Sequence, residues 1–382
     1  MSQTKDSIIL NFKKQNSKIV YNFDKLKGSN FVKKINESNF RKCIIFCDKN
    51  ILNLFSTEFK KIKKKVIIKK LVAKENLKKI KNVEAIIHYF EKNKVNKSDL
   101  VLTIGGGTIS DLISFCCSIY MRGIIFWSIP TTLISQVDAL SAGKTCINTN
   151  KSKNLIGTFY YAQNVFIIPE LVINSSYFNY RQGLSEILKY GLLGNKKIIN
   201  ILYKNSYKNK ILNKKLLIKI IKLTVITRAK IAKKNPLASN LGHTFGHALE
   251  KIYRNKIKHG DAVAAGTYIA NLFALNEKLI TVNQFEFIKS LMIKLGLNLW
   301  IDKNLNKKKM IEIIRYDKKN HGSNINLVLI KGIGLQYQKN KNNFFFSTNE
   351  KKIKKFLLNL NKQHEFLTQN MLIKINKNNI RY

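Results

Sequence analysis

Three of the six histidines lie in one short stretch of the chain, at His243, His247 and His259. Residues 243 and 247 are four positions apart, which places both imidazoles on one face of a helix. Histidines at this spacing are common zinc ligands, although a surface or core pair without a metal is the alternative. Their clustering in a histidine-poor chain favours a metal site. A catalytic zinc ion has three protein ligands and one open position, so a carboxylate would complete the set.

A second charged constellation, Glu186 and Lys189, stands in the otherwise apolar segment GLSEILKYG at residues 183–191. The two side chains are three positions apart and therefore share one helix face. An ordinary ion pair on a surface helix is one interpretation. Because the flanking residues are apolar and small, a buried charge that is paired or bound to a metal is favoured.

The glycines at 105–107 follow an apolar strand pattern at 100–104 and precede a helical pattern at 110–120. Glycine lets the backbone approach a pyrophosphate, and a helix N-terminus favours negative charge. A tight turn would explain the glycines alone, but their context favours a phosphate site.

A polar segment after Pro130 contains Asp138, Lys144, Lys153 and Asn154. Lysines near glycine and asparagine suit a phosphate or carboxylate pocket. In a lysine-rich chain each lysine alone would be a solvated side chain, so only the whole constellation indicates a site.

The elements that must position these residues alternate in the first half of the chain. Strand patterns at 43–47, 100–104 and 124–129 enclose helical patterns at 83–90 and 110–120, which predicts a parallel, nucleotide-binding βαβ sheet. From about residue 174 the pattern is mostly helical, with helices predicted at 183–193, 216–234, 243–253, 261–274 and 284–295. We therefore expect an α/β domain at 1–170, a mainly α-helical domain at 171–362, and a polar C-terminal tail at 363–382.

Composition indicates a globular protein. Of 382 residues, 45% are hydrophobic, and no apolar run reaches the roughly 20 residues that cross a bilayer. Five cysteines without a secretory leader predict reduced thiols, with those at 43, 47, 116 and 117 buried, and a cytoplasmic location.

The net charge of +47 has two interpretations. One is a surface that binds nucleic acid or a membrane. The other is compositional drift, because lysine is scattered along the whole chain together with asparagine and isoleucine, as at 195–200 and 303–309. The scatter favours drift, so we expect weak polyanion binding but no specific nucleic acid and no membrane partner.

Together, several segments resemble the 3-dehydroquinate synthase family. They occur in the family's order between residues 105 and 322, and read GGGTISDLISFCCSIYMRG, IPTTLISQVDALSAGKT, KNLIGTFY, GLSEILKYG, NLGHTFGHALE, HGDAVAAG and DKKNHG. The resemblance implies an N-terminal Rossmann-like domain for NAD, followed by a mainly α-helical domain for metal and substrate. It also implies a homodimer, because Arg122 matches a residue that the family lends to the partner subunit's phosphate site.

The resemblance assigns roles position by position. The zinc ligands would be Glu186, His243 and His259, with cobalt as an alternative metal; this replaces the pairing of His243 with His247. NAD contacts would be Asp48, Asn50, Glu75, Lys78, Gly106, Gly107, Asp111, Thr131, Thr132 and Lys153. Catalytic residues would be Lys144, Lys189, Asn240, His247 and Arg122, and further substrate contacts would be Asp138, Asn154, Arg228, Lys318 and Lys319.

The implied substrate is a sugar phosphate, 3-deoxy-D-arabino-heptulosonate 7-phosphate. In the implied reaction NAD transiently oxidises the substrate, phosphate is eliminated, the hydride returns, and an intramolecular aldol reaction closes the ring of 3-dehydroquinate. The reaction is the second step of the shikimate pathway, which leads to the aromatic amino acids.

The sequence departs from the family before Asn240. An acidic segment is shortened, Pro236 stands where the family has an arginine expected to bind the substrate carboxylate, and Arg228 replaces a lysine. We therefore expect a raised KM for the heptulosonate. The segment 169–174 also differs from the family pattern.

The alternatives to a 3-dehydroquinate synthase are another sugar phosphate cyclase of the inosose or valiolone type, a polyol dehydrogenase, an inactive homologue, or a basic nucleic-acid-binding protein.

Overall fold

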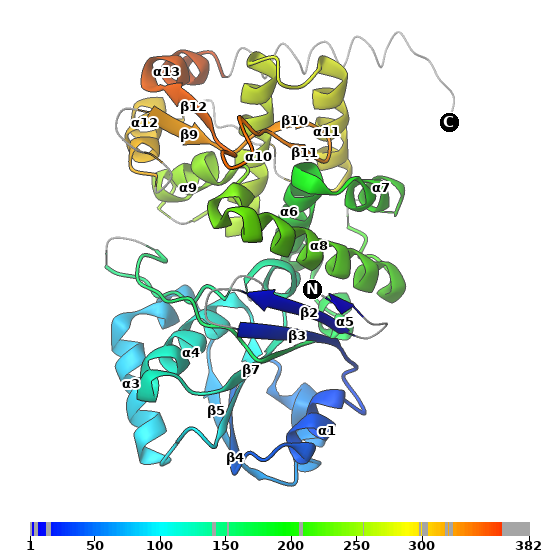
Figure 1. The fold of residues 1–382 in the computed structure, drawn as a ribbon, viewed down its shortest axis with the longest axis vertical. Coiled ribbons are helices and arrows are strands. Elements are labelled where there is room, and N and C mark those ends of the chain that lie inside the picture. The colour runs from blue at the N-terminus through cyan, green and yellow to red at the C-terminus, as the bar shows by residue number, and fades with distance from the viewer. Residues whose placement is uncertain are drawn as a thin grey trace. The chain divides into compact units, whose positions relative to one another are not determined.

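The computed structural model describes residues 2–3, 7–12, 17–139, 143–150, 153–205, 209–254, 256–297, 299, 305–317, 320 and 324–360. The chain folds into two compact units, shown in Figure 1. The N-terminal unit comprises residues 1–191 and 195–236, and the C-terminal unit comprises residues 192–194 and 237–382.

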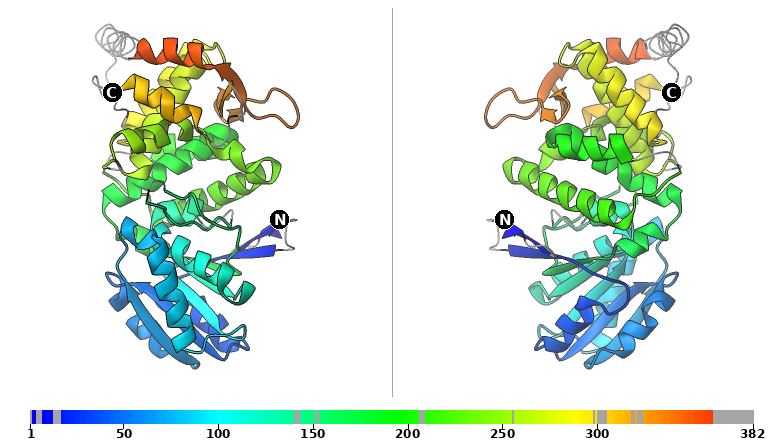
Figure 2. Two further views of the ribbon diagram at one scale, coloured as in Figure 1. Left: turned by 90° about the vertical axis from the view of Figure 1, so that its left-hand side faces the viewer. Right: turned by 90° about the vertical axis from the view of Figure 1, so that its right-hand side faces the viewer.

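A mixed sheet forms the centre of the N-terminal unit. Its strand order is β1-β2-β3-β8-β7-β6-β4-β5, and the run from β3 to β5 is parallel. The strands are β1 (Ser2–Gln3), β2 (Ser7–Phe12), β3 (Ser17–Phe23), β4 (Lys42–Asp48), β5 (Lys65–Leu71), β6 (Leu100–Gly105), β7 (Phe126–Pro130) and β8 (Asn164–Ile167). The three predicted strands β4, β6 and β7 are parallel, as expected, and the antiparallel hairpin β2–β3, which was not predicted, extends the sheet at one edge (Figure 2).

Helices cover both faces of this sheet. Cys43 and Ile45 of β4 share a buried cluster with Phe31 of α1 (Asn30–Glu37), whereas Phe46 contacts Phe90 of α3 (Ile80–Lys92). Successive strand residues point to opposite faces, so apolar residues at every position of β4 bury against both helix layers. The remaining helices of this unit are α2 (Ser56–Lys60), α4 (Gly107–Ile119), α5 (Pro169–Ile173), α6 (Tyr177–Gly194), α7 (Lys196–Asn205) and α8 (Lys214–Lys234).

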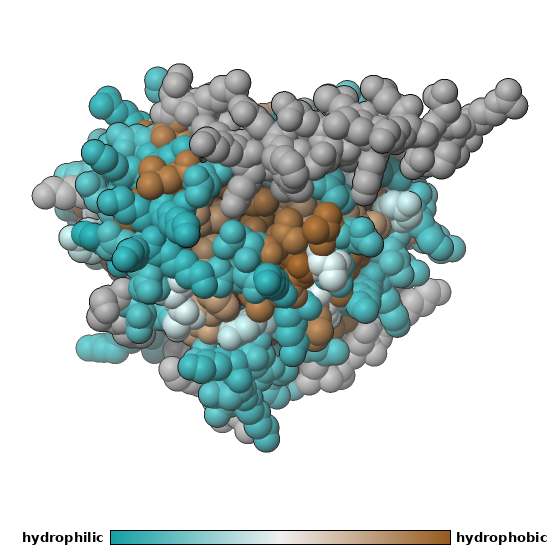
Figure 3. Space-filling view, turned by 90° about the horizontal axis from the view of Figure 1, so that it is seen from above, coloured by the Kyte–Doolittle hydropathy of each residue, from teal (hydrophilic) through white to brown (hydrophobic). Residues whose placement is uncertain are grey.

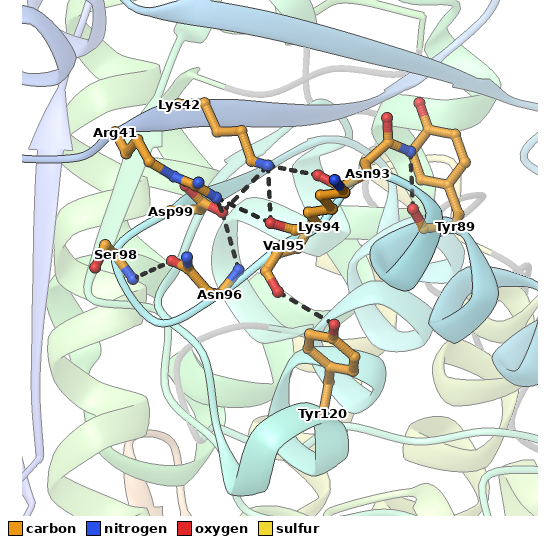
Figure 4. Close-up of polar contacts among 10 residues, drawn as sticks. All are labelled: Arg41, Lys42, Tyr89, Asn93, Lys94, Val95, Asn96, Ser98, Asp99 and Tyr120. Carbon is orange, nitrogen blue, oxygen red and sulfur yellow. Dashed lines mark hydrogen bonds and ion pairs between the residues drawn. The ribbon is translucent and has the colours of Figure 1, made fainter.

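A cluster of hydrogen bonds and ion pairs connects the N-terminal ends of β4 and β6 (Figure 4). The Asp99 carboxylate is fully buried and accepts hydrogen bonds from Arg41 Nε at 3.0 Å and Arg41 Nη2 at 2.9 Å. It also accepts the Asn96 backbone N–H at 2.9 Å, and the Lys42 ammonium lies 3.5 Å away. This cluster lies at the opposite ends of these strands from Asp48 and the glycine turn.

The C-terminal unit is mainly helical, as predicted. It contains α9 (His243–Ile252), α10 (His259–Asn276), α11 (Val282–Lys294), α12 (Lys307–Arg315) and α13 (Glu350–Leu358). Two small antiparallel sheets, which were not predicted, pair β9 (Asn324–Leu327) with β12 (Phe346–Asn349) and β10 (Ile330–Gly332) with β11 (Leu335–Gln336). Hydrophilic residues surround an apolar area on the face of this unit in Figure 3.

Glycines bring α9 and α10 into close contact. A Cβ added at Gly266 would lie 2.2 Å from the Gly242 carbonyl oxygen and 2.6 Å from the Gly246 nitrogen. Gly242 itself has a φ of +76°, which other residues rarely adopt. The backbones of the two histidine-bearing helices therefore meet where only glycine fits.

The predicted strands and helices are present, with bounds that differ by a few residues. The predicted division near residue 170 falls where the sheet ends, but helices α5, α7 and α8 and most of α6 belong to the same compact unit as the sheet. No helix among the described residues is both long and apolar enough to cross a membrane.

Candidate active site

The carboxyl ends of the parallel strands bring several predicted cofactor residues to one edge of the sheet. Asp48 ends β4, the glycine turn follows β6, and Thr131 follows β7. The Asp48 carboxylate accepts the backbone N–H of Asn50 at 3.1 Å, and the Thr131 N–H donates to the Gly105 carbonyl at 3.1 Å. This edge is where open α/β sheets bind nucleotides.

The glycine turn leaves room for a close approach to the backbone. Nothing lies within 4 Å of a Cβ built on Gly107, the first residue of α4, and one built on Gly106 would lie 3.4 Å from the Thr132 methyl carbon. Backbone N–H groups at the start of this helix suit an anion. The predicted phosphate-binding turn therefore has the expected local structure.

The Lys78 side chain contacts three other residues beside that turn. Its ammonium lies 2.6 Å from the Asp111 carboxylate and 2.5 Å from the Asn154 side-chain oxygen, and contacts the Cys146 sulfur at 3.2 Å. Burial lowers the pKa of Lys78, but the charges of Asp111 and its neighbours outweigh burial and raise it. Lys78 is therefore a fixed cation, and it connects the predicted NAD contact Asp111 with the predicted substrate contact Asn154.

Asn148 and Cys146 belong to this cluster and were not predicted. The Asn148 amide donates to Glu75 at 2.7 Å, and its oxygen accepts the backbone N–H of Asn154 at 2.9 Å. Asn154 has a φ of +54°, a conformation that asparagine tolerates better than most residues. Burial and the Asp111 carboxylate raise the pKa of the Cys146 thiol to about 12, so the thiol stays protonated. Both residues lie between Lys144 and Asn154 in the sequence, and this position is the only sequence feature that indicates them as site residues.

A second network joins helices α6 and α8 to the segment that carries Asp138. The Tyr190 hydroxyl donates to Asp138 Oδ1 at 2.6 Å, and Arg228 Nε donates to the same oxygen at 2.8 Å. Arg228 Nε also lies 2.9 Å from the Tyr190 oxygen. Arg228 and Tyr190 are buried, and Asp138 is partly exposed. The structure thus brings together two predicted substrate contacts through a tyrosine that was not predicted.

Glu186 and Lys189 form a buried ion pair on α6, as the apolar flanks predicted. The Lys189 ammonium also lies 3.9 Å from Asp138 Oδ1. Burial lowers the pKa of Lys189, but Glu186, Tyr190 and Asp138 together raise it above the usual value. The Lys189 ammonium therefore keeps its charge in the interior at neutral pH.

The three clustered histidines converge in the C-terminal unit. Ring centroids lie 5.7 Å apart for His243 and His259 and 5.3 Å apart for His243 and His247. His243 Nδ1 lies 3.1 Å from the Leu241 carbonyl oxygen, and His259 Nδ1 lies 3.4 Å from Glu250 Oε2. An acceptor beside Nδ1 keeps the proton on that nitrogen and leaves Nε2 for a metal. Glu250 was not predicted; a carboxylate seven positions after the first histidine was its only sequence signal.

The remaining predicted residues have less defined surroundings. Lys144 pairs in a β-bridge with Phe159, Lys153 is half-buried, and the Asn240 carbonyl accepts the His243 N–H at 3.1 Å. Arg122 is exposed at the end of the short 3-10 helix Tyr120–Arg122 that follows α4, with a φ of +61°. Lys318 and Lys319 lie outside the described residues.

Comparisons with known proteins identify relatives along most of the chain. Residues 68–177 match the family model described as 3-dehydroquinate synthase N-terminal, and residues 183–320 match 3-dehydroquinate synthase C-terminal. The chain is 35% identical to the 3-dehydroquinate synthase of Pelagibacter ubique, over 86% of this chain and 93% of the relative. It is 31% identical to that of Clostridium beijerinckii, over 80% of this chain and 90% of the relative.

Solved structures support the fold. A 2-deoxy-scyllo-inosose synthase complexed with carbaglucose-6-phosphate, NAD⁺ and Co²⁺ superposes with a TM-score of 0.81 at 20% identity, covering 92% of this chain and 99% of the other. A valiolone synthase from Streptomyces hygroscopicus with NAD⁺ and Zn²⁺ bound gives a TM-score of 0.77 at 19% identity, covering 90% and 96%. Because the family models match well over half of the sequence and curated relatives match along nearly their full lengths, the chain belongs to the 3-dehydroquinate synthase family.

Proposed function

We propose that this chain converts 3-deoxy-D-arabino-heptulosonate 7-phosphate to 3-dehydroquinate and phosphate, as a carbon–oxygen lyase of aromatic amino-acid biosynthesis. The observation that carries the proposal is the 35% identity to a 3-dehydroquinate synthase across 93% of that relative. The buried, paired charges on α6 and the convergent histidines supply the polar groups that such chemistry requires.

Zinc is the proposed metal, with cobalt as the alternative, and Glu186, His243 and His259 are the proposed ligands. Two imidazoles and one carboxylate are the donor set of many catalytic zinc sites. The Nδ1 atoms of both histidines already face acceptors, which fits metal binding through Nε2. When bound, the ion would act as a Lewis acid on adjacent substrate hydroxyls.

NAD is the proposed organic cofactor, and it would accept a hydride and return it within one turnover. The open glycine turn at Gly106 and Gly107 would accept the pyrophosphate at the N-terminus of α4. The proposed contacts beyond the turn are Asp48, Asn50, Glu75, Lys78, Asp111, Thr131, Thr132 and Lys153. Of these, Lys78 and Asp111 are already held together by their ion pair.

The chain's own side chains would bind and orient the substrate. Lys144, Lys189, His247 and Arg122 would offset the charge of the phosphate and carboxylate groups, and His247 would also move a proton. Asp138, Asn154, Arg228 and Asn240 would hold hydroxyl groups, with Lys318 or Lys319 as further contacts. Because Lys189 and Arg228 are anchored by Glu186 and Asp138, they need little reorganisation when substrate binds.

Substrate affinity should reflect the departure before Asn240. Helix α8 continues to Lys234, and Pro236 begins a short 3-10 helix, Pro236–Ser239. Proline has no side-chain donor for a carboxylate, so we expect a KM for the heptulosonate above that of a family enzyme with the full segment. Equal KM values would contradict this expectation.

We also propose a cytoplasmic homodimer. Arg122 is exposed in the short 3-10 helix Tyr120–Arg122, where Met121 and Arg122 both have positive φ, and its guanidinium would complete the phosphate site of the partner subunit. The five free cysteines, of which four are buried, suit a reducing compartment. Sedimentation of the purified chain would test the dimer.

The test of the proposed function is a coupled assay for 3-dehydroquinate and phosphate with heptulosonate 7-phosphate. Turnover should stop when a chelator removes the metal and return when zinc is added. A second candidate is another sugar phosphate cyclase, favoured by the proline at position 236. Glucose 6-phosphate and sedoheptulose 7-phosphate should therefore be assayed in parallel, and preferential phosphate release from either would favour that candidate.

A further inference from the structure

Tyr190 occupies the centre of the charged network in the N-terminal unit. Its side chain is about 1% exposed, and its hydroxyl contacts Asp138 Oδ1 at 2.6 Å and Arg228 Nε at 2.9 Å. The Lys189 ammonium lies 4.2 Å from the centre of its ring. Three charged groups proposed to hold the substrate therefore touch one neutral side chain.

The hydrogen-bond directions at Tyr190 follow from the partners. A guanidinium N–H can only donate, so the phenol oxygen accepts from Arg228. An ionised carboxylate can only accept, so the phenol hydrogen points to Asp138. Burial, with Asp138 nearby, raises the pKa of Tyr190 although Arg228 opposes the change, which agrees with a protonated phenol. Of the common side chains, few can fill both roles at this point.

We propose that Tyr190 is a positioning residue for substrate binding: it holds Asp138 and Arg228 in one fixed arrangement. The inference rests on the proposed function, since it assumes that these two residues contact the sugar phosphate. Without the hydroxyl the carboxylate would lose one of its fixed donors and could turn about its side-chain torsions. Part of the free energy of substrate binding would then be needed to restore the arrangement of Asp138 and Arg228, so the substrate would bind more weakly.

The test compares two matched variants on the same helix. Tyr190→Phe removes only the central hydroxyl and keeps the ring. Tyr180→Phe removes another buried hydroxyl of α6, which accepts the Leu212 backbone N–H at 3.4 Å. We expect Tyr190→Phe to raise KM about tenfold or more, the factor for losing a hydrogen bond to a charged group, with kcat within about twofold. Tyr180→Phe should leave both constants unchanged.

A double-mutant cycle separates positioning from a general effect on the fold. In an Asp138→Asn background, Tyr190→Phe should raise KM by clearly less than it does in the wild type, because the charged acceptor is already gone. Equal factors in both backgrounds, or a KM for Tyr190→Phe like that of Tyr180→Phe, would overturn the inference. Should Tyr190→Phe not fold, Arg228→Lys removes the Nε donor from the same network, and an unchanged KM there would also overturn it.

The two hypotheses fail in different ways. A folded, metal-loaded wild type that does not turn over heptulosonate 7-phosphate would reject the proposed function, and this inference with it. An active wild type with an unaffected Tyr190→Phe variant would reject only the role of Tyr190.

Discussion

At the scale of single residues, the site depends on which atom of each side chain is already engaged. His243 and His259 each have an acceptor beside Nδ1, and the acceptors differ: a backbone carbonyl for His243 and the Glu250 carboxylate for His259. A carbonyl is fixed by the backbone, whereas a carboxylate can be removed by mutation. The orientation of His259 can therefore be tested without changing the proposed ligands.

Glu250→Gln should weaken zinc binding by about tenfold to a hundredfold, because an amide is a poorer acceptor for the imidazole N–H than a carboxylate. Competition with a chromophoric chelator would measure the affinity independently of turnover. Glu277→Gln is the control, since Glu277 pairs with Lys352 at 2.6 Å in the same unit. An affinity equal to that of the control variant would show that Glu250 does not orient His259.

Residue types could be predicted from the sequence, but most of their partners could not. The histidine spacing, the charged pair in an apolar helix and the glycine turn each indicated chemistry through local patterns. Asp138 and Arg228 meet only because α8 packs beside the segment that carries Asp138, and no local pattern records this contact. Tyr190 lies within an apolar helical segment, and hydrophobic periodicity does not record the hydrogen bonds of its hydroxyl group.

At the scale of elements, burial on two faces made some strands predictable. β4 and β6 are buried along almost their whole length, so they appear in the sequence as continuous apolar runs. β5 was missed because it is an edge strand, and three of its residues are exposed lysines, at positions 65, 69 and 70. The hairpin β2–β3 was missed because no local pattern records that β3 pairs with β8, which lies far from it in the sequence.

Asp99→Ala should destabilise the N-terminal unit by about 3 kcal/mol at pH 7, since it leaves the Lys42 ammonium buried without its carboxylate. Although burial raises the pKa of Asp99, its hydrogen bonds from Arg41 and Asn96 lower it below the usual value on balance. A lowered pKa in the folded state means that this stabilisation is present above the unfolded pKa of about 4 and is lost as pH falls below it.

Urea unfolding of wild type and Asp99→Ala at pH 7 and at acidic pH would measure this difference. The gap between the two proteins should shrink on acidification. Glu91→Ala, which removes an exposed pair with His88, should change stability by less than about 0.5 kcal/mol. A pH-independent gap for Asp99→Ala would contradict the electrostatic explanation.

Gly266→Ala should force α9 and α10 apart, because the new methyl group would overlap the backbone of Gly242 and Gly246. We expect a loss of about 1–3 kcal/mol in stability and weaker zinc binding, since His243 and His259 lie on the two helices. Thermal unfolding and chelator competition would measure both effects. Gly107→Ala has no atom within 4 Å of its added Cβ and should leave zinc affinity unchanged.

At the scale of the whole molecule, the charge of +47 opposes folding through self-repulsion. Added salt shortens the Debye length from about 30 Å at 0.01 M to about 10 Å at 0.1 M. The thermal midpoint should therefore rise over this range of sodium chloride. A midpoint that falls with salt would indicate that attractive surface pairs outweigh the repulsion.

The same charge predicts weak, sequence-independent binding of polyanions that disappears at moderate salt. Specific, salt-resistant DNA binding by a metal-free preparation would instead favour the nucleic-acid-binding alternative. Filter binding at two salt concentrations would distinguish these outcomes.

The exposed lysines of β5 have a consequence for neighbouring molecules in a crowded solution. An outermost strand offers unpaired backbone groups to which a second copy of the chain could add its own strand. On β5, two copies aligned in that way would bring rows of ammonium groups against one another. The exposed lysines of β5 therefore oppose strand addition at this edge, and with it the precipitation that fibril-like stacking would cause.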